Sequence, residues 1–143
     1  MTWTLRPATP EDEDAVIALW RECGLVIPAN DPVGDFRRAR GRIGSEIFLA
    51  VDGDAILGSA MIGHDGHRGW VYYLATTPAR RGCGIARSLI AQAEAWMIER
   101  EIPKLHLLVR NTNAGVIGFY ETQGFNVHPV AMLQKVLLPG SAE

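Results

Sequence analysis

The sequence is poor in cysteine and has no long apolar run. Its two cysteines, Cys23 and Cys83, have neither paired nor CxxC spacing, so we predict reduced thiols rather than a disulfide framework. No uninterrupted stretch of 18 apolar residues is present, and the N-terminal residues MTWTLRPATPEDED lack the apolar centre of a signal peptide. These absences predict a cytoplasmic protein that does not act at a membrane.

The chain also lacks a large excess of either positive or negative charge. The chain has 14 Lys and Arg against 16 Asp and Glu, a formal net charge of −2 at pH 7, which argues against a nucleic-acid surface. Its four histidines lack metal-ligand spacing, so no metal site is expected. The 143 residues, 48% of them hydrophobic, suffice for one core. We expect a single domain over 1–138 and a loose tail over 139–143.

The hydrophobic pattern predicts a mixed sheet with helices on its faces. Thr9 is the expected N-cap of the first helix, because Pro10 and several acids follow it. Strands expected over 70–76 and 104–110 are separated by a long helix, which predicts parallel neighbours. The predicted element order is βααβββαβαβ(β). Strands are expected over 2–7, three times between 46 and 76, over 104–110, and once or twice over 125–138. Helices are expected from Pro10, over 32–43, over 84–100, and in a last segment that ends at Gly124.

The segment RRGCGIA is a glycine-rich loop directly before a helix. Gly82 and Gly84 permit left-handed backbone and leave N–H groups exposed, and the helix N-terminus adds partial positive charge. Such a site favours an anion, most naturally a phosphate or diphosphate, and Arg80 and Arg81 add donors beside it. The alternative is a plain strand-to-helix turn with solvated arginines.

Two common phosphate-binding motifs do not match this loop. A Rossmann loop needs a small residue where this chain has Arg87, and the chain is short of the alternating units of a dinucleotide fold. The pattern G-x-x-x-x-G-K-S/T of a P-loop is absent. A nucleotide-binding Rossmann fragment is therefore disfavoured.

Arg81 to Ala86 matches the pattern Q/R-x-x-G-x-G/A and in this resembles the GNAT superfamily of N-acetyltransferases. The strand WVYYLATTP precedes the loop and an amphipathic helix follows it. The later segment NAGVIGFYETQGF resembles the second motif of the superfamily, N-x-x-A-x-x-L/F-Y-E-x-x-G-F, with Gly115 and Val116 departing from it. The resemblance covers nearly the whole chain and is close to small bacterial members with an NDP segment, here 30–32, and a DGHRG turn, here 65–69.

The resemblance implies a GNAT fold, an α/β (α+β) architecture in which about four helices flank a mixed, mostly antiparallel sheet of six to seven strands. It also implies an acetyl-CoA-dependent N-acetyltransferase, in which a primary amine of a small molecule or protein attacks directly within a ternary complex. No metal is involved, and homodimers are common in the superfamily. The residues implied to contact the coenzyme are Leu74, Ala75, Thr76, Arg80, Arg81, Gly82, Cys83, Gly84, Ile85, Ala86, Asn113 and Tyr120.

Asn113 and Tyr120 are seven residues apart, so they share one face of the helix, about 10 Å apart along its axis. Asn113 can meet the pantetheine amides, or cap the helix, or do both. Tyr120 can donate a hydrogen bond to the departing thiolate, with a structural aromatic as the alternative. Cys83 occupies an unspecified position of the loop and is assigned no chemistry.

The general base is open at this stage, because WVYYLATTP lacks the glutamate that many members carry there. His67 and Asp65 are candidates, with Tyr72 or Tyr73 acting through water and Glu46 as others. The alternative is an ordinary polar turn at HDGHRG, with a water chain removing the proton.

Asn30, Asp31 and Tyr72 are candidate acceptor-binding residues. The segment IPANDPVGDF lies between the two early helices, which wall the acceptor pocket in the superfamily, and an Asn/Asp-Pro turn that starts the second helix is the alternative. The competing function is a non-catalytic module that binds acyl-CoA as a sensor. Such a module would keep the glycine loop and lose the groups near the sulfur.

Overall fold

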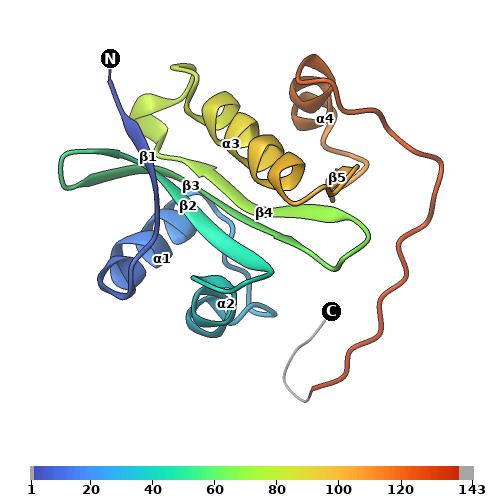
Figure 1. The fold of residues 1–143 in the computed structure, drawn as a ribbon, viewed down its shortest axis with the longest axis horizontal. Helices are drawn as coiled ribbons and strands as arrows, with labels where there is room; N and C mark the ends of the chain where they lie inside the picture. The colour runs from blue at the N-terminus through green and yellow to red at the C-terminus, as the bar shows by residue number, and fades with distance from the viewer. Residues whose placement is uncertain (1, 139–143) are drawn as a thin grey trace.

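Residues 2–138 are described by a computed structural model of the chain, and the tail expected at 139–143 lies outside them. These residues form a five-stranded sheet and four α-helices (Figure 1). The elements are β1 (Thr4–Pro7), η1 (Pro10–Asp12), α1 (Glu13–Glu22), α2 (Pro32–Ala39), β2 (Ser45–Asp52), β3 (Ala55–His64), β4 (Gly69–Thr76), η2 (Pro78–Arg80), α3 (Ile85–Glu99), β5 (Leu105–Leu107) and α4 (Ala114–Thr122).

The sheet has the strand order β1-β2-β3-β4-β5. Each neighbouring pair is antiparallel except β4 and β5, which are parallel and are connected through α3. This pair confirms the prediction that the two strands flanking the long helix are parallel neighbours. The predicted fold class, a mixed and mostly antiparallel sheet with helices on its faces, is confirmed.

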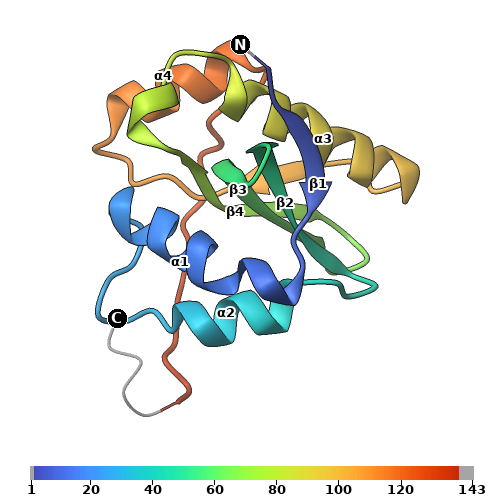
Figure 2. The same ribbon diagram turned by 90° about the vertical axis from the view of Figure 1, so that its left-hand side faces the viewer.

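Helices cover both faces of the sheet (Figures 1 and 2). α1 and α2 lie on one face, and α3 lies on the other. The side chains of β2 alternate between the two cores: Ile47 and Leu49 join the core under α1, while Ala50 joins the core under α3. Two separate apolar cores therefore hold α1, α2 and α3 on the sheet.

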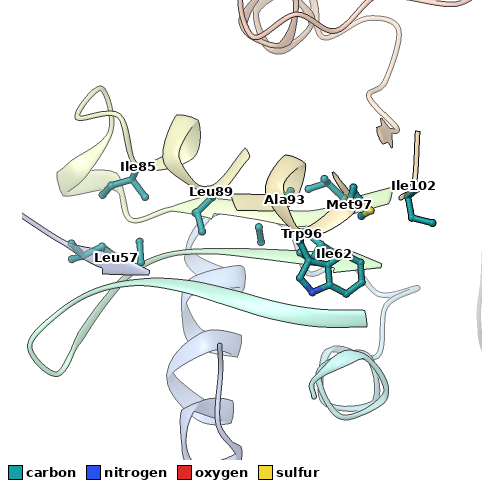
Figure 3. Close-up of a cluster of buried hydrophobic side chains, with 11 residues drawn as sticks. Leu57, Ile62, Ile85, Leu89, Ala93, Trp96, Met97 and Ile102 are labelled. Carbon is teal, nitrogen blue, oxygen red and sulfur yellow. The ribbon is translucent and has the colours of Figure 1, made fainter. Parts of the chain in front are cut away.

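α3 is held by the apolar face that its sequence predicts (Figure 3). Close approach at its first turn is possible because Gly58 on β3 has no side chain. A Cβ at Gly58 would lie 2.7 Å from Ile85 Cγ2 and 2.8 Å from Ala75 O. This close approach places the N-terminus of α3, directly after the glycine loop, against the start of β3 and the end of β4. The side chains of α3 in this core are Ile85, Leu89, Ala93, Trp96 and Met97.

The first helix begins as a short 3-10 turn, η1, and continues as α1. Thr9 lies at its start as predicted, and the Thr9 N–H donates to Asp12 Oδ2 at 2.7 Å. Asp12 also accepts from Arg6 on β1 through both carboxylate oxygens, at 2.8 and 3.0 Å. This ion pair joins the edge strand to the start of the helix.

The structure differs from the sequence prediction in the strand count. The sheet has five strands rather than six or seven, because the described part of 125–138 forms neither helix nor strand. A strand forms only where an edge accepts its backbone groups, and this segment leaves the sheet instead of pairing with β5 (Figure 1). α2 is also shorter than predicted, because Arg40 is extended and Gly41 has a φ of 64°.

Candidate active site

β4 has an unpaired edge where it approaches the glycine loop. Only residues 69–71 of β4 pair with β5, at residues 105–107. From 72 to 76, no strand of the described chain borders that edge. The two parallel strands therefore separate, and backbone groups of β4 remain available on that side.

Two backbone donors lie along this unpaired edge. The Thr77 N–H donates to Leu57 O at 2.8 Å, on the β3 side. Because the N–H groups of a strand alternate between its two edges, those of Thr76 and Leu74 face away from β3, whereas that of Ala75 faces β3. The edge therefore offers donors at every second residue, which is the spacing that an extended amide chain can pair with.

A β-bulge at Tyr73 interrupts β4 beside this edge. The β3–β4 register shifts between Ser59 and Met61, and Tyr73 is the extra residue, with a left-handed φ of 51°. Ser59 Oγ donates to Tyr73 O at 2.9 Å and accepts from Trp20 Nε1 at the same distance. The Tyr73 ring stacks on Trp20 with centroids 3.9 Å apart. The bulge thus directs the Tyr73 side chain to the α1 face of the sheet.

The glycine loop adopts the backbone that its sequence predicts. Gly82 has a φ of 81° and Gly84 a φ of 96°, both in the left-handed region. No atom lies within 4 Å of the position that a Cβ of Gly82 would occupy. Gly84 is the N-cap of α3, and a helix start leaves its first N–H groups without intrahelical acceptors. The loop therefore combines open space, free donors and the positive end of a helix dipole.

The two arginines before the glycines have different partners. Arg80 is half-buried, and its Nη2 lies 3.3 Å from Asp52 Oδ2. Arg81 is exposed, and its Nη2 lies 3.7 Å from the sulfur of Cys23. Arg81 is therefore the more accessible cation beside the loop. Cys83 is a free thiol, as predicted for both cysteines.

α4 carries Asn113 and Tyr120. The Asn113 side chain accepts from Val116 N at 3.3 Å and is the N-cap of α4, which confirms the capping alternative. Tyr120 makes edge-to-face contacts with Phe119 and Phe125, and burial raises its pKa above the ordinary value. Its hydroxyl makes no hydrogen bond to any described residue. The phenol is therefore protonated at neutral pH and available as a donor.

A cavity of about 450 Å³ lies on the α1–α2 side of β4. Its polar groups form one network around Tyr73, whose hydroxyl donates to Asp35 Oδ2 at 2.7 Å and accepts from Asn30 Nδ2 at 3.2 Å. Burial, together with the Asp35 carboxylate, raises the pKa of Tyr73 well above its ordinary value. The cavity is lined by Leu25, Asn30, Asp35, Met61, Tyr72 and Tyr73.

The carboxylate in this cavity is Asp35, which sequence reasoning missed. Asp31, the predicted candidate, accepts from Gly34 N at 3.1 Å and is the N-cap of α2, as the turn alternative held. Asp35 follows one helical turn later, and the same helix turns its side chain to Tyr73. The spacing of four residues from the N-cap is the signal that could have identified it. Asn30 and Tyr72 line the cavity, and their role in binding the acceptor stays a prediction.

The candidate bases are dispersed. Asp65 and Tyr72 line a second cavity of about 490 Å³, which shares Tyr72 and Met61 with the first, and His67 lines neither. Asp65 Oδ1 accepts from His67 N and Arg68 N, and these hydrogen bonds lower the pKa of the carboxyl. Burial raises the pKa of Tyr72. The lowered pKa makes the Asp65 carboxylate a weaker base, whereas the raised pKa keeps Tyr72 a protonated phenol at neutral pH, which cannot accept the proton.

Glu46, another candidate base, makes structural hydrogen bonds. Its Oε1 accepts from Gly41 N at 3.0 Å and from Ile47 N at 2.8 Å, which ties the end of α2 to β2. Among the described residues, no three of His, Cys, Asp and Glu are grouped so that they could hold a metal ion. Within 2–138, none of the helices has the length and apolar character needed to cross a membrane.

The Acetyltransferase (GNAT) family matches residues 13–125. The chain belongs to this family. An acetyltransferase of Pectobacterium atrosepticum is 42% identical over 128 residues, covering 90% of this chain and 91% of the relative. An uncharacterized N-acetyltransferase of Yersinia pestis is 42% identical over 129 residues, with the same coverage.

Solved structures agree with the fold of this GNAT protein. A predicted acetyltransferase of Clostridium acetobutylicum, solved with acetyl-CoA, superimposes with a TM-score of 0.77 at 18% identity, over 94% of this chain and 96% of that chain. The resemblance to the superfamily is thereby confirmed, and the chain is an N-acetyltransferase by family. The roles of the individual site residues are argued from the geometry of this chain.

Proposed function

We propose that this GNAT protein transfers an acetyl group from acetyl-CoA to the primary amine of a cationic acceptor by direct attack in a ternary complex. The observation that carries the proposal is the continuity between the unpaired edge of β4 and the left-handed glycine loop at the start of α3. The first offers backbone donors to an extended amide chain, and the second offers donors to a diphosphate. Acetyl-CoA contains both groups and supplies an activated thioester.

The residues present fit this co-substrate. Gly82 and Gly84 themselves add no side chains to the loop, and open space surrounds the position that a Gly82 Cβ would occupy. Backbone N–H groups from Arg81 to Ala86 would bind the diphosphate, that of Arg81 also donating to Pro78 O at 3.4 Å, and the exposed Arg81 side chain would add a cation beside them. The N–H groups of Leu74 and Thr76 would pair with the pantetheine arm. Asn113 caps α4 and can use its remaining polar atoms toward the same arm.

Tyr120 would act on the sulfur. When the acceptor nitrogen forms its bond to the acetyl carbon, the carbon–sulfur bond breaks and negative charge develops on sulfur. The Tyr120 phenol, protonated because burial raises its pKa, would donate a hydrogen bond to that charge. A full proton transfer is disfavoured, because a phenol is a weaker acid than a thiol.

The cavity beside Tyr73 supports a cationic acceptor. Asp35 supplies a carboxylate, whose Oδ1 also accepts from the exposed Arg38 Nη2 at 2.7 Å, and Asn30 supplies an amide oxygen. Leu25 and Met61 supply apolar walls. An ammonium group favours such a carboxylate, and the apolar walls suit its carbon chain. The proton released by the amine would pass to water, because the lowered pKa of Asp65 weakens it as a base and the raised pKa values of Tyr72 and Tyr73 keep both phenols protonated at neutral pH. His67 and Asp65 in a direct role remain an alternative that a pH profile of their alanine variants would test.

The test is release of free thiol from acetyl-CoA in the presence of a panel of amines. The panel should include a polyamine, a lysine peptide, a peptide with a free N-terminus, an amino acid and an aminoglycoside. We expect turnover with at least one cationic amine and none with the matched acetylated compound. Tight binding of acetyl-CoA without turnover on any amine would instead support the non-catalytic acyl-CoA sensor.

A further inference from the structure

The second cavity, of about 490 Å³, adjoins the cavity beside Tyr73, and the proposed reaction does not use it. The two cavities share Met61 on β3 and Tyr72 on β4, which are cross-strand partners. From this shared wall the second cavity extends along β3 to His64 and is bordered by the end of α2 and the segment after it. A molecule bound in the first cavity can therefore reach the second past the shared side chains.

The direction of β4 determines which cavity lies nearer the glycine loop. β4 ends at Thr76, and the loop follows it along the chain. Tyr73 lines only the first cavity, whereas Trp70, three residues earlier on the strand, lines only the second. The second cavity is therefore the more distant from the loop along β4. An acceptor whose amine points toward the acetyl-CoA site would place its opposite end there.

The second cavity contains a cation that no carboxylate of the described chain neutralises. Arg42 follows α2, and its guanidinium donates to Arg38 O at 3.2 Å and to Arg37 O at 2.9 Å. These two hydrogen bonds hold the guanidinium at the end of the helix. A guanidinium has five N–H groups, and the others have no partner among residues 2–138. Arg42 thus offers a held cation with donors to spare.

The other formally charged side chains of this cavity already have partners. Arg38 Nη2 donates to Asp35 Oδ1 at 2.7 Å, which joins the two cavities by an ion pair. Asp65 Oδ1 accepts from two backbone N–H groups of its own turn, at 2.9 and 2.8 Å. Arg42 is therefore the charged side chain that remains for a ligand, and its charge favours an anion.

The wall that the two cavities share continues as aromatic surface. The rings of Trp70 and Tyr72 are stacked with centroids 6.5 Å apart, and Tyr72 is 46% exposed. Such surface, together with Met61, favours a carbon chain over a further charge. The chain therefore presents a carboxylate, an apolar wall and a cation along one continuous path.

We propose that the acceptor carries an anionic group in addition to its amine, and that Arg42 binds this group while Asp35 receives the amine. The inference rests on the proposed function, because it takes the amine to lie in the cavity beside Tyr73. Gly63 of the second cavity lies two residues beyond the shared Met61, which separates the two ends by about 7 Å. An α-amino acid is too short, because one carbon joins its amine and carboxylate. The acceptor class is an amine joined to a carboxylate or phosphate through several carbons.

Calorimetric titration in the presence of CoA tests this arrangement on the wild-type chain without requiring turnover. The probes are 6-aminohexanoate, which spans about 7 Å when extended, 6-aminohexyl phosphate, and hexylamine, which lacks the anionic group. We expect an anionic probe to bind roughly 5- to 10-fold more tightly than hexylamine, because charge-assisted hydrogen bonds to Arg42 are added. The tighter of the two anionic probes identifies the group preferred. Binding of neither anionic probe more tightly than hexylamine would overturn the proposal.

Substitution of Arg42 assigns the effect to its guanidinium. Arg42→Met should abolish the advantage of the anionic probe, whereas hexylamine affinity should change by less than about twofold, which also shows that the cavity is folded. Arg42→Lys keeps the charge and should keep part of the advantage. The matched control is Arg21→Met, because Arg21 is exposed on α1 and lines neither cavity. An advantage that persists in Arg42→Met, or falls equally in Arg21→Met, would overturn the proposal.

Thiol release with the same probes separates this inference from the proposed function. We expect kcat/KM for the preferred anionic probe to exceed that for hexylamine roughly 5- to 10-fold. Equal kcat/KM for the two would overturn the inference and leave the acetyltransferase function intact. Binding of the anionic probe through Arg42, without thiol release on any amine, would overturn the proposed function and support Arg42 as the anion-binding residue.

Discussion

Among individual side chains, Tyr120 is the group that we propose acts on the departing sulfur. It lies on α4 between two aromatic rings, and its hydroxyl has no hydrogen-bond partner among residues 2–138. For Tyr120→Phe we expect kcat to fall roughly 10- to 100-fold, because one donor to the transition-state charge is lost. The dissociation constant of acetyl-CoA, measured by calorimetry, should change by less than about threefold.

The pKa of Tyr120 adds a pH criterion to this prediction. Burial raises the pKa above its ordinary value of 10.0, so the phenol stays protonated up to and beyond that pH. The midpoint of any loss of activity caused by Tyr120 ionisation should lie above pH 10 in the wild type, and this loss should be missing from the kcat profile of Tyr120→Phe. Equal losses in turnover and coenzyme binding would identify Tyr120 as a structural residue.

Asp35 is the residue through which acceptor charge can be tested. Asp35→Asn keeps a hydrogen-bond acceptor for Tyr73 and removes the negative charge from the cavity. We expect KM for the cationic acceptor to rise roughly 10-fold, in line with the loss of one charge-assisted contact, while acetyl-CoA affinity stays the same. Steady-state kinetics with the acceptor found in the thiol-release panel would measure this.

The control for Asp35 is Asp54→Asn, which removes a carboxylate in the exposed turn between β2 and β3. It changes net charge equally and should leave acceptor KM unchanged. If both variants raise KM by the same factor, the effect comes from the change in the protein's net charge and not from a contact of Asp35 with the acceptor. If neither does, Asp35 does not bind the acceptor.

Sequence reasoning reached some of these residues and missed others for a physical reason. Tyr120 follows from a local motif, whereas the roles of Asp35 and Tyr73 depend on a contact between residues 38 positions apart. The bulge that turns Tyr73 toward α1 arises from the register between β3 and β4. Nothing within WVYYLAT marks that extra residue, because pairing across strands is a tertiary property.

Among the elements, the glycine loop is the one whose backbone conformation can be tested directly. Gly82 has a φ of 81° and open space around its Cα, so Gly82→Ala adds backbone strain and one methyl group without a clash. We expect acetyl-CoA affinity to fall roughly 10-fold, because strain of about 1–2 kcal/mol favours a loop in which the N–H groups no longer converge. Calorimetric titration with CoA would measure the loss.

Gly41→Ala is the matched control for the loop. Gly41 also has a left-handed φ, 64°, and no atom lies within 4 Å of its Cβ position, but it follows α2, far along the chain from the loop. Both variants should lower the melting temperature by a similar amount. A similar loss of CoA affinity in both variants would attribute the effect to general destabilisation and would remove the loop from the binding site.

The elements also show why a strand can be predicted and still be missing from a sheet. α3 was predicted from its own period, and it forms because its apolar face meets β3 and β4 of the same chain. Residues 125–138 have the apolar character of a strand, but a strand needs an edge as well as a sequence. The edge of β5 is present, but the segment runs away from it, so the predicted strand does not form in the described chain.

At the level of the whole molecule, the site is assembled from separate elements by packing. Asp35 comes from α2, Tyr73 from β4, the glycine loop from the start of α3, and Tyr120 from α4. The two cores hold α2 and α3 on opposite faces of the sheet, so the cavity beside Tyr73 and the start of α3 lie on opposite sides of β4. The order of helices and strands predicted from the sequence already implies helices on both faces of the sheet. It does not predict the β-bulge at Tyr73.

Global stability should depend on pH through the ion pair that joins β1 to the start of α1. Hydrogen bonds from Arg6 lower the pKa of Asp12 from 3.8 to about 2. Because the folded-state pKa lies below the unfolded one, the stabilisation is complete above about pH 4 and is lost as pH falls toward 2. It amounts to about 2 kcal/mol, and the Asp12 side chain is only 12% exposed, so screening by solvent is limited.

Asp12→Asn should therefore lower the free energy of unfolding by about 2 kcal/mol at pH 7, and by progressively less as the pH falls from 4 to 2. Urea unfolding at several pH values would measure both, with Asp54→Asn as the exposed control, for which no such convergence is expected. Curves for wild type and Asp12→Asn that stay parallel down to pH 2 would show that the ion pair contributes no pH-dependent stability. The contact between the sheet edge and α1 would then rest on the apolar core under α1 alone.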